Sequence, residues 1–265
     1  MLIFLLSTCR REYSTEGGIY TTACLNDYTA SCKLLKIEYT ANGVLGAANT
    51  VDLTYTGNQL TKATDNISNR TFTWQAGLIV KIEYRDAGTN FRQYTETIGY
   101  VKVNNEWKIS VIKKAILNQP PGIDTFRISY NYNSSGRLTR KTLETKIWRS
   151  GVWTPQATID FDYNSGGNIY QVRASDLTVN PSTTRTIPLT WSGNCNTWLK
   201  VFPLIELVDY EARDEMGGLS PVFFSRLFAA TTNGLFTTFT LNSSHAVQKY
   251  YQDNKLIATY TYDCP

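Results

Sequence analysis

The chain has 265 residues, of which 42% are hydrophobic and 18% charged, so it can bury a sizeable core and lacks the composition of a disordered protein. Aromatic residues reach 13% and include seventeen tyrosines, which favours strands joined by polar turns. The 26 basic residues are scattered among 22 acidic ones and give a net charge of +4. A nucleic-acid binder would show a clustered basic stripe, so we expect no nucleic-acid partner.

The N-terminus has the pattern of a targeting signal. Residues 2–6 are continuously apolar, and Leu6-Ser7-Thr8-Cys9 is similar to a bacterial lipobox, in which the Cys is acylated. The run is too short for a whole signal peptide and lacks a basic start, so we interpret it as the end of one. The alternative is a short apolar terminus without function. We therefore expect an exported protein of the bacterial cell envelope, in the outer membrane or periplasm, lipid-anchored at Cys9.

The cysteines are odd in number, which agrees with one being modified. Lipidation of Cys9 leaves four for disulfides, which could pair in three ways: Cys24, Cys32, Cys195 and Cys264. One pairing closes a short loop from Cys24 to Cys32 and ties Cys195 to Cys264, and the alternative is four free thiols. With no CxxC and a single histidine, a structural zinc site is not expected. We expect no metal and no cofactor.

A recurring phrase organises the chain: an aromatic residue, a short polar turn containing Gly or Asn, and then an aliphatic residue. It begins at Tyr39, Tyr55, Trp74, Tyr132, Tyr163 and Tyr251, with a partial copy at Trp191-Ser-Gly193. Gly and Asn tolerate the positive φ of tight turns. The flanking segments alternate apolar and polar residues, as in Leu35-Lys-Ile37-Glu-Tyr39, which predicts half-buried antiparallel strands.

Two segments depart from the hairpin pattern. Pro120-Pro121-Gly122 predicts a long turn between two blocks of hairpins. Residues 204–216 have helical spacing and 222–228 follow a Ser-Pro start, which predicts two short helices. The fold class is therefore mainly β: an elongated or curved antiparallel meander with two helices on one face. Residues 1–9 would be the signal and lipobox, 10–32 a tether with a cysteine loop, and 33–265 one domain with a helical insertion at about 203–229.

The phrase resembles the Tyr-Asp (Rhs-type) repeat, and its best copy is Tyr132-Asn-Ser-Ser-Gly136-Arg137-Leu138-Thr139. The whole chain also resembles a group of Bacteroidota lipoproteins of uncharacterised function, in which such hairpins precede a short helical segment and a closing hairpin. The resemblance implies an envelope location. It implies no catalytic activity and no catalytic residue.

Few side chains have the pattern of a catalytic site. His245 is the only histidine, and we interpret it as a surface residue in the turn before the last hairpin. Paired carboxylates could serve a glycosidase or hold Ca²⁺, and the candidates are Glu38, Asp52, Glu83, Asp160 and Asp162. Asp160 and Asp162 alternate with Phe161 and should share one face of a strand. The usual role of such residues is a solvated strand surface.

The aromatic residues suggest candidate binding surfaces. Most should form the cross-strand core, but four lie outside the phrase and could form an exposed binding surface: Tyr100, Trp107, Trp148 and Trp153. We expect a non-enzymatic envelope module that binds a protein, glycan or lipid. One alternative is a periplasmic carrier with an apolar cleft at Leu204, Leu207, Phe223 and Phe224. The other is a carbohydrate-active enzyme with paired carboxylates.

Overall fold

A computed structural model describes residues 32–43, 45–116, 123–147, 151–164, 169–179, 181–195, 226–231, 237–242 and 246–264. These residues form one sheet of sixteen antiparallel strands. The first eight are β1 (Lys33–Tyr39), β2 (Asn49–Thr56), β3 (Gln59–Thr64), β4 (Ser68–Gln75), β5 (Leu78–Asp86), β6 (Arg92–Val103), β7 (Glu106–Ile116) and β8 (Ile123–Tyr132). The others are β9 (Leu138–Ile147), β10 (Trp153–Tyr163), β11 (Ile169–Asp176), β12 (Thr183–Cys195), β13 (Arg226–Thr231), β14 (Thr237–Leu241), β15 (Val247–Gln252) and β16 (Lys255–Asp263).

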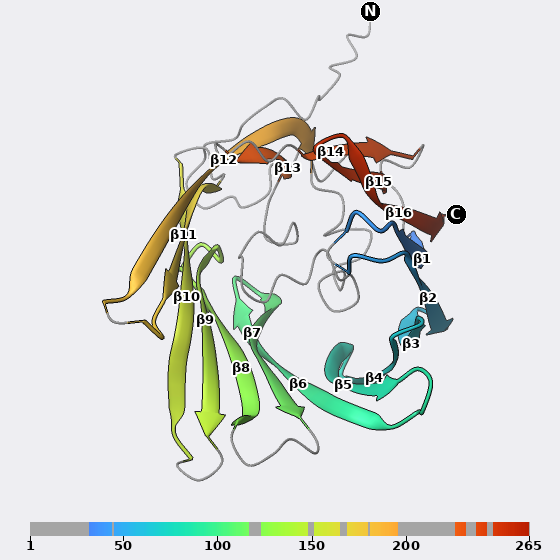
Figure 1. Ribbon diagram of the computed structural model, residues 1–265, viewed down its shortest axis with the longest axis horizontal. Helices are drawn as coiled ribbons and strands as arrows, with labels where there is room; N and C mark the ends of the chain where they lie inside the picture. The colour runs from blue at the N-terminus through green and yellow to red at the C-terminus, as the bar shows by residue number, and fades with distance from the viewer. Residues whose placement is uncertain are drawn as a thin grey trace, which may run out of the picture.

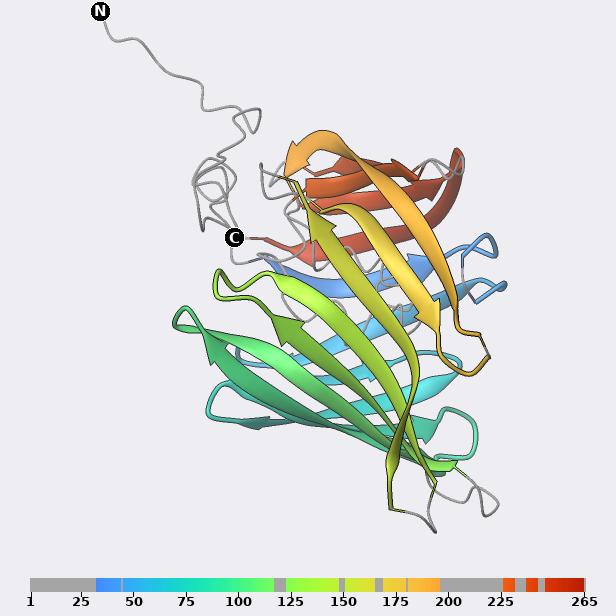
Figure 2. The same ribbon diagram turned by 90° about the vertical axis from the view of Figure 1, so that its left-hand side faces the viewer.

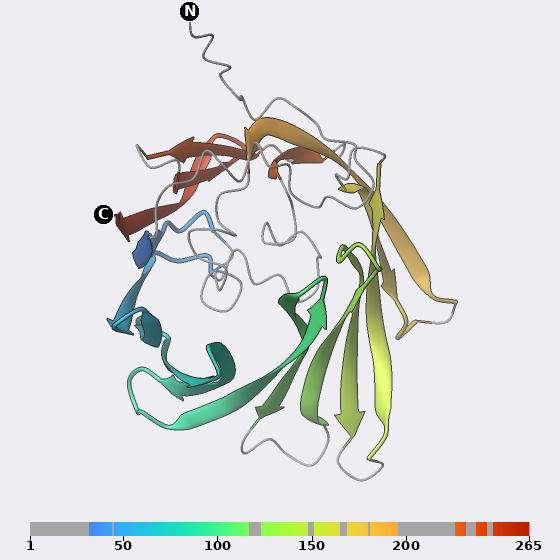
Figure 3. The same ribbon diagram turned by 180° about the vertical axis from the view of Figure 1, so that it is seen from behind.

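The meander curves round on itself, so that the first and last strands of the chain become neighbours. β1 to β13 follow one another in the sheet, and β16 pairs with the free side of β1 with Ile37 opposite Tyr260. Figure 1 shows the resulting ring, and Figures 2 and 3 show the blue β1 beside the red C-terminal strands. The mainly β class is confirmed, and of the two predicted forms of the meander, elongated or curved, the structure has the curved one.

The inner face of the ring is apolar and the outer face polar. In β2, Val51 and Leu53 are buried while Asp52 and Thr54 are exposed, which is the period-two pattern expected of an antiparallel sheet with one wet face. One continuous core joins inner residues of most strands, from Leu34 in β1 to Tyr260 in β16. Because the inner aliphatic side chains are close to zero exposure, burial of this face is the main stabilising contribution of the fold.

The hairpin phrase marks real turns in all six full copies, because each joins two consecutive strands of the sheet. The partial copy was wrong: Trp191 and Gly193 lie inside β12, where the register with β13 shifts between Trp191 and Cys195. An irregular strand accommodates a Gly without turning the chain.

The predicted helices are not found in the described part of the chain. Residues 204–216 lie outside the described residues. The second helix was to run to Phe228, but β13 begins at Arg226, and Trp191 of β12 lies opposite Phe228. A long-range strand partner therefore overrides the local preference there. Among the described residues, none belongs to a helix long and apolar enough to cross a membrane.

Aromatic side chains bind the strands together at one end of the ring. Tyr hydroxyl groups at the ends of β2, β6, β8 and β10 donate to a carbonyl at the start of the preceding strand, at 2.7–2.8 Å: Tyr55 to Leu34, Tyr100 to Ile79, Tyr132 to Ile109 and Tyr163 to Leu138. The Trp74 Nε1 group donates to Leu60 O in the same way, at 2.7 Å. In four of the six full copies, the aromatic residue of the phrase is thus a long-range anchor.

A basic residue directly precedes the anchoring carbonyl in three of these five hairpins. Lys33 Nζ lies 5.9 Å from the Tyr55 ring centroid, and Lys108 Nζ lies 6.0 Å from the Tyr132 centroid. The Arg137 guanidinium lies 5.4 Å from the Tyr163 centroid. These distances allow a cation–π contribution beside each Tyr hydrogen bond. The Arg-Leu pair of the best repeat copy therefore has a structural role, in which Arg137 covers the ring that Leu138 O anchors.

Candidate functional site

The ring has two ends with different chemistry, which we name the disulfide rim and the capped rim. The disulfide rim holds the start of β1, the end of β16, and the turns that follow β2, β4, β6 and β8. The capped rim holds the turns that follow β3, β5, β9, β11 and β15. Because neighbouring strands are antiparallel, every second turn falls on the same rim.

The disulfide rim is fixed by a covalent bond between the two ends of the folded chain. Cys32 and Cys264 form a disulfide across 232 positions, next to the Lys33–Asp263 pair of β1 and β16. The pairing of Cys32 with Cys24 and of Cys264 with Cys195 was therefore wrong. Sequence proximity favoured the short loop, but the pairing of the first and last strands brings the distant cysteines together. Cys9 and Cys24 lie outside the described residues.

The capped rim is held by aspartate side chains within its own turns. Asp65 Oδ1 accepts the Ile67 and Ser68 amides at 2.7 and 2.8 Å. Asp86 Oδ1 accepts the Thr89 amide and hydroxyl, both at 2.8 Å. These bonds hold the pKa of the Asp86 carboxyl below its ordinary value. Asp176 caps Thr178 in the same way, with the same direction of pKa shift.

Exposed apolar side chains gather on the capped rim. Of nine large apolar side chains that are exposed among the described residues, five lie in its turns: Ile67, Phe91, Val152, Leu177 and Val179. The Ala87 amide donates to Ile67 O at 3.2 Å, which joins the tips that carry Ile67 and Phe91. The Leu177 amide donates to Gln156 O at 2.9 Å, which joins the next pair of tips. The rim thus offers two apolar patches on capped turns.

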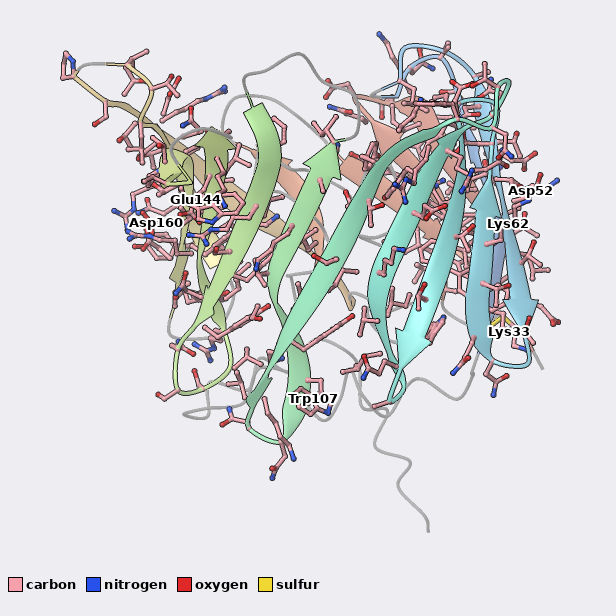
Figure 4. The ribbon with its side chains drawn as sticks, turned by 90° about the horizontal axis from the view of Figure 1, so that it is seen from below. Lys33, Asp52, Lys62, Trp107, Glu144 and Asp160 are labelled. Atoms are coloured by element: carbon pink, nitrogen blue, oxygen red, sulfur yellow. A yellow bond between two sulfur atoms is a disulfide. The ribbon has the colours of Figure 1, made fainter. Side chains whose placement is uncertain are left out.

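The predicted exposed aromatics fall into different environments. Trp107 is 57% exposed at the tip of the β6–β7 hairpin on the disulfide rim, where Figure 4 shows it at the same end as Lys33. Tyr100 is not exposed, because it is one of the anchors; burial raises its pKa to about 12. Trp153 is half-buried on the outer face, with the Arg127 guanidinium 4.4 Å from its ring centroid. Trp148 lies outside the described residues.

The candidate carboxylates are paired with basic residues on the outer face. Asp160 accepts from Arg140 Nε at 2.6 Å, and Asp162 binds Arg173 through two contacts of 2.9 and 3.0 Å. The hydrogen bonds from Arg173 lower the pKa of Asp162. Asp160 and Asp162 share one face, as expected. Both carboxylates are therefore engaged in cross-strand ion pairs on the outer face.

Two of the other candidate carboxylates, Glu83 and Asp52, also have basic neighbours, whereas Glu38 is exposed on β1. Glu83 lies among Lys81, Arg85 and Arg92, and the hydrogen bond from Arg85 lowers its pKa. Asp52 faces Lys36 at 3.8 Å on the exposed surface. On the wall formed by β8 and β9, Figure 4 marks Glu144, which binds Arg127 at 2.5 and 2.7 Å. Glu83 and Glu144 are therefore ion-paired with Arg residues, and Glu144 is buried in its pair.

Sequence reasoning missed a group of charged residues on the inner face. Arg70 binds Asp65 at 2.9 Å with both side chains buried, and Glu96 accepts the Tyr84 hydroxyl at 3.2 Å. Lys141 lies 5.4 Å from the Tyr130 ring centroid. A signal was present, because Arg70 falls in phase with Phe72 and Trp74 along β4. Each has a described partner, as buried charges require.

Several predicted residues lie outside the described part of the chain. They are His245 and the four residues of the apolar cleft, Leu204, Leu207, Phe223 and Phe224. The carrier hypothesis therefore stays a prediction. The described inner wall is packed, since Leu34, Ile37, Val51 and Ile82 have no exposed surface.

Comparison with known proteins gives only distant structural likenesses. No family model and no curated protein matches the sequence. A porin-like protein from Bacteroides uniformis is 11% identical, with a TM-score of 0.45 over 87% of this chain and 98% of that one. One from Bacteroides vulgatus is 10% identical, with a TM-score of 0.37 over the same shares. The Photorhabdus luminescens Tc holotoxin pore is 12% identical, with a TM-score of 0.34 over 77% of this chain and 11% of that one. These likenesses carry no function to this chain.

Proposed function

We propose that this chain is a non-enzymatic protein of the bacterial cell envelope, held by a lipid on Cys9, and that it binds a partner protein through the apolar tips of the capped rim. The observation that carries the proposal is the concentration of exposed apolar side chains on that rim. Single exposed apolar residues are ordinary, but a group confined to one end of a molecule is typical of an interaction surface.

The construction of the turns supports this role. Aspartate caps fix the turn backbones, so the tips that carry Ile67 and Phe91 need little ordering when a partner binds. A preorganised surface loses less conformational entropy on association. The Ala87–Ile67 hydrogen bond also joins the two turns that carry these side chains. Phe91, at 57% exposure, is the natural central contact because aromatic residues dominate interface energetics.

A non-enzymatic role agrees with the surroundings of the carboxylates. Asp162, Glu83 and Glu144 all have lowered pKa values caused first by a hydrogen-bonded Arg, so each is a stable anion near neutral pH. A stable anion of this kind is a poor general acid.

The test is binding to a partner isolated from a cell-envelope extract. A protein captured by the full chain would be identified by mass spectrometry, purified and titrated calorimetrically against the chain and its variants. We expect the double variant Ile67→Thr, Phe91→Ser to weaken binding at least about tenfold, because two apolar contacts are lost. The matched control is Tyr170→Ser, which removes a 46% exposed aromatic residue from β11 outside the rim. Equal binding by the double variant, or an equal loss in the control, would rule out the capped rim.

A further inference from the structure

We propose that the disulfide rim docks on an anionic lipid surface through the β6–β7 hairpin, with Trp107 and Lys102 as its contacts. This surface is separate from the capped rim. The disulfide rim would then face the membrane, and the capped rim would face the partner protein.

The tip of this hairpin combines the side chains that bind lipid headgroups. Lys102 pairs directly with Trp107 across the two strands, and Val101 beside them is exposed. Trp is typical of the boundary between headgroups and acyl chains, and Lys binds the headgroup phosphate. Asn104 and Asn105 form the turn with φ values of 51° and 65°, a tight hairpin turn that holds the tip in shape. Hence Trp107 and Lys102 are presented together.

The charge of the rim favours the same partner. Among the described residues at this end of the strands and in its turns, four basic side chains stand against two acidic ones: Lys33, Lys102, Lys108 and Arg137 against Glu106 and Asp263. On the capped rim, three acidic side chains stand beside three basic ones: Asp86, Asp176 and Asp253 beside Arg85, Arg92 and Lys255. An anionic surface therefore attracts the disulfide rim more strongly than the capped rim, although the capped rim exposes more apolar side chains.

The position of the proposed lipid anchor agrees with this orientation. Cys32 is fixed at the disulfide rim by its bond to Cys264, and Cys9 precedes it by 23 positions. That length reaches at most about 80 Å, so an acylated Cys9 would tether the chain to the bilayer from this rim. This step rests on the proposed lipidation, whereas the contacts of Trp107 and Lys102 do not.

The experiment measures vesicle binding without the lipid anchor. The full chain with Cys9→Ser would be floated with vesicles of equal parts phosphatidylglycerol and phosphatidylcholine, and with pure phosphatidylcholine. We expect binding only to the anionic vesicles, and weaker binding as salt is raised. In this background, Lys102→Glu should weaken binding at least about fivefold, because the charge near the surface is reversed. Trp107→Ser should weaken it by about tenfold, because a buried aromatic contact is lost.

Matched controls lie on the opposite rim. Phe91→Ser removes an aromatic side chain of the same 57% exposure, and Lys255→Glu reverses an exposed charge in the β15–β16 turn. Both should bind anionic vesicles within about twofold of the parent. Unchanged melting temperatures would show that the variants fold. The proposal is overturned if the chain does not bind anionic vesicles, if it binds pure phosphatidylcholine equally, or if the Phe91 and Lys255 variants lose as much binding as those of Trp107 and Lys102. These results do not depend on capture of a partner protein by the capped rim.

Discussion

The two rims of the ring are stabilised over different distances along the chain. At the disulfide rim, each Tyr hydroxyl reaches a carbonyl 21 to 25 positions earlier, and the disulfide spans 232 positions. At the capped rim, each aspartate binds amides only two or three positions away. The Tyr hydrogen bonds and the disulfide join different strands, whereas each aspartate cap stabilises a single turn. Damage to the disulfide rim should therefore lower global stability, and damage to the capped rim should remain local.

The largest effect should come from the disulfide that joins the start of β1 to the end of β16. The double variant Cys32→Ser, Cys264→Ser should lower the free energy of unfolding by about 4 kcal/mol, because a very long loop is no longer closed in the unfolded state. Urea denaturation at neutral pH measures the difference. Peptide mapping of the oxidised parent should find Cys32 linked to Cys264, and a Cys24–Cys32 peptide would contradict this account.

Removal of one anchor should have the next largest effect. Tyr132→Phe deletes the hydroxyl that donates to Ile109 O at 2.8 Å and leaves the ring in place, so we expect a loss of about 1 kcal/mol. The same change at Tyr170, a 46% exposed side chain, is the control and should cost less than about 0.3 kcal/mol. Equal losses at the two positions would show that the hydrogen bond contributes nothing specific.

The anchors also predict how stability depends on alkaline pH. Burial raises the pKa of Tyr100 from 10.0 to about 12, so the folded protein holds this proton more tightly than the unfolded chain does. Its contribution to stability is complete below about pH 10 and is lost as the pH rises through about 12. Denaturation midpoints at rising pH should fall less in Tyr100→Phe than in the parent. If the midpoints of the parent and of Tyr100→Phe fell equally with rising pH, the raised pKa of Tyr100 would be contradicted.

The turn capped by Asp86 should lose stability at acidic pH, and the effect should be confined to that turn. The pKa of Asp86 is lowered, so its caps are intact above the ordinary carboxyl pKa of about 4 and are lost as the pH falls below it. In Asp86→Ala, the Gly88 and Thr89 amides should exchange hydrogen faster at neutral pH, while amides of β1 and β16 are unchanged. Asp86→Asn keeps an acceptor and is the control. Faster exchange throughout the sheet would mean that the rims are not independent.

The smallest effect concerns a strained turn of the disulfide rim. Ala76 has a φ of 49°, in the left-handed region that disfavours a β-carbon. Asn tolerates this conformation, so Ala76→Asn should stabilise the fold by about 0.5 kcal/mol in urea denaturation. Asn105→Ala, at a φ of 65° in the matching turn, should have the opposite sign. If both substitutions stabilised the fold, backbone strain at Ala76 would not explain the gain from Ala76→Asn.

The sequence pattern did not identify Tyr100 as an anchor, because it describes only residues close together in the chain. Its hairpin runs nine positions from Tyr100 to its cross-strand partner Ile109, against five from Tyr55 to its partner Leu60, so it did not fit the phrase. The Asn104-Asn105 pair was the available signal for a turn. The Tyr100 hydroxyl donates to Ile79 O, which lies in the preceding strand β5. The repeated phrase is defined by residues that follow the aromatic position, so it does not include this acceptor.

Most strands, the turns of the repeated phrase and the side of the sheet on which most charges lie could be predicted from the chain alone. Alternation and turn chemistry act between residues only a few positions apart, so they can be read along the chain. The pairing of β1 with β16, the Cys32–Cys264 bond and the gathering of alternate turns into a basic and an apolar rim could not be predicted in this way. Strand pairing at long range depends on how the whole sheet curves, and no short segment specifies that curvature.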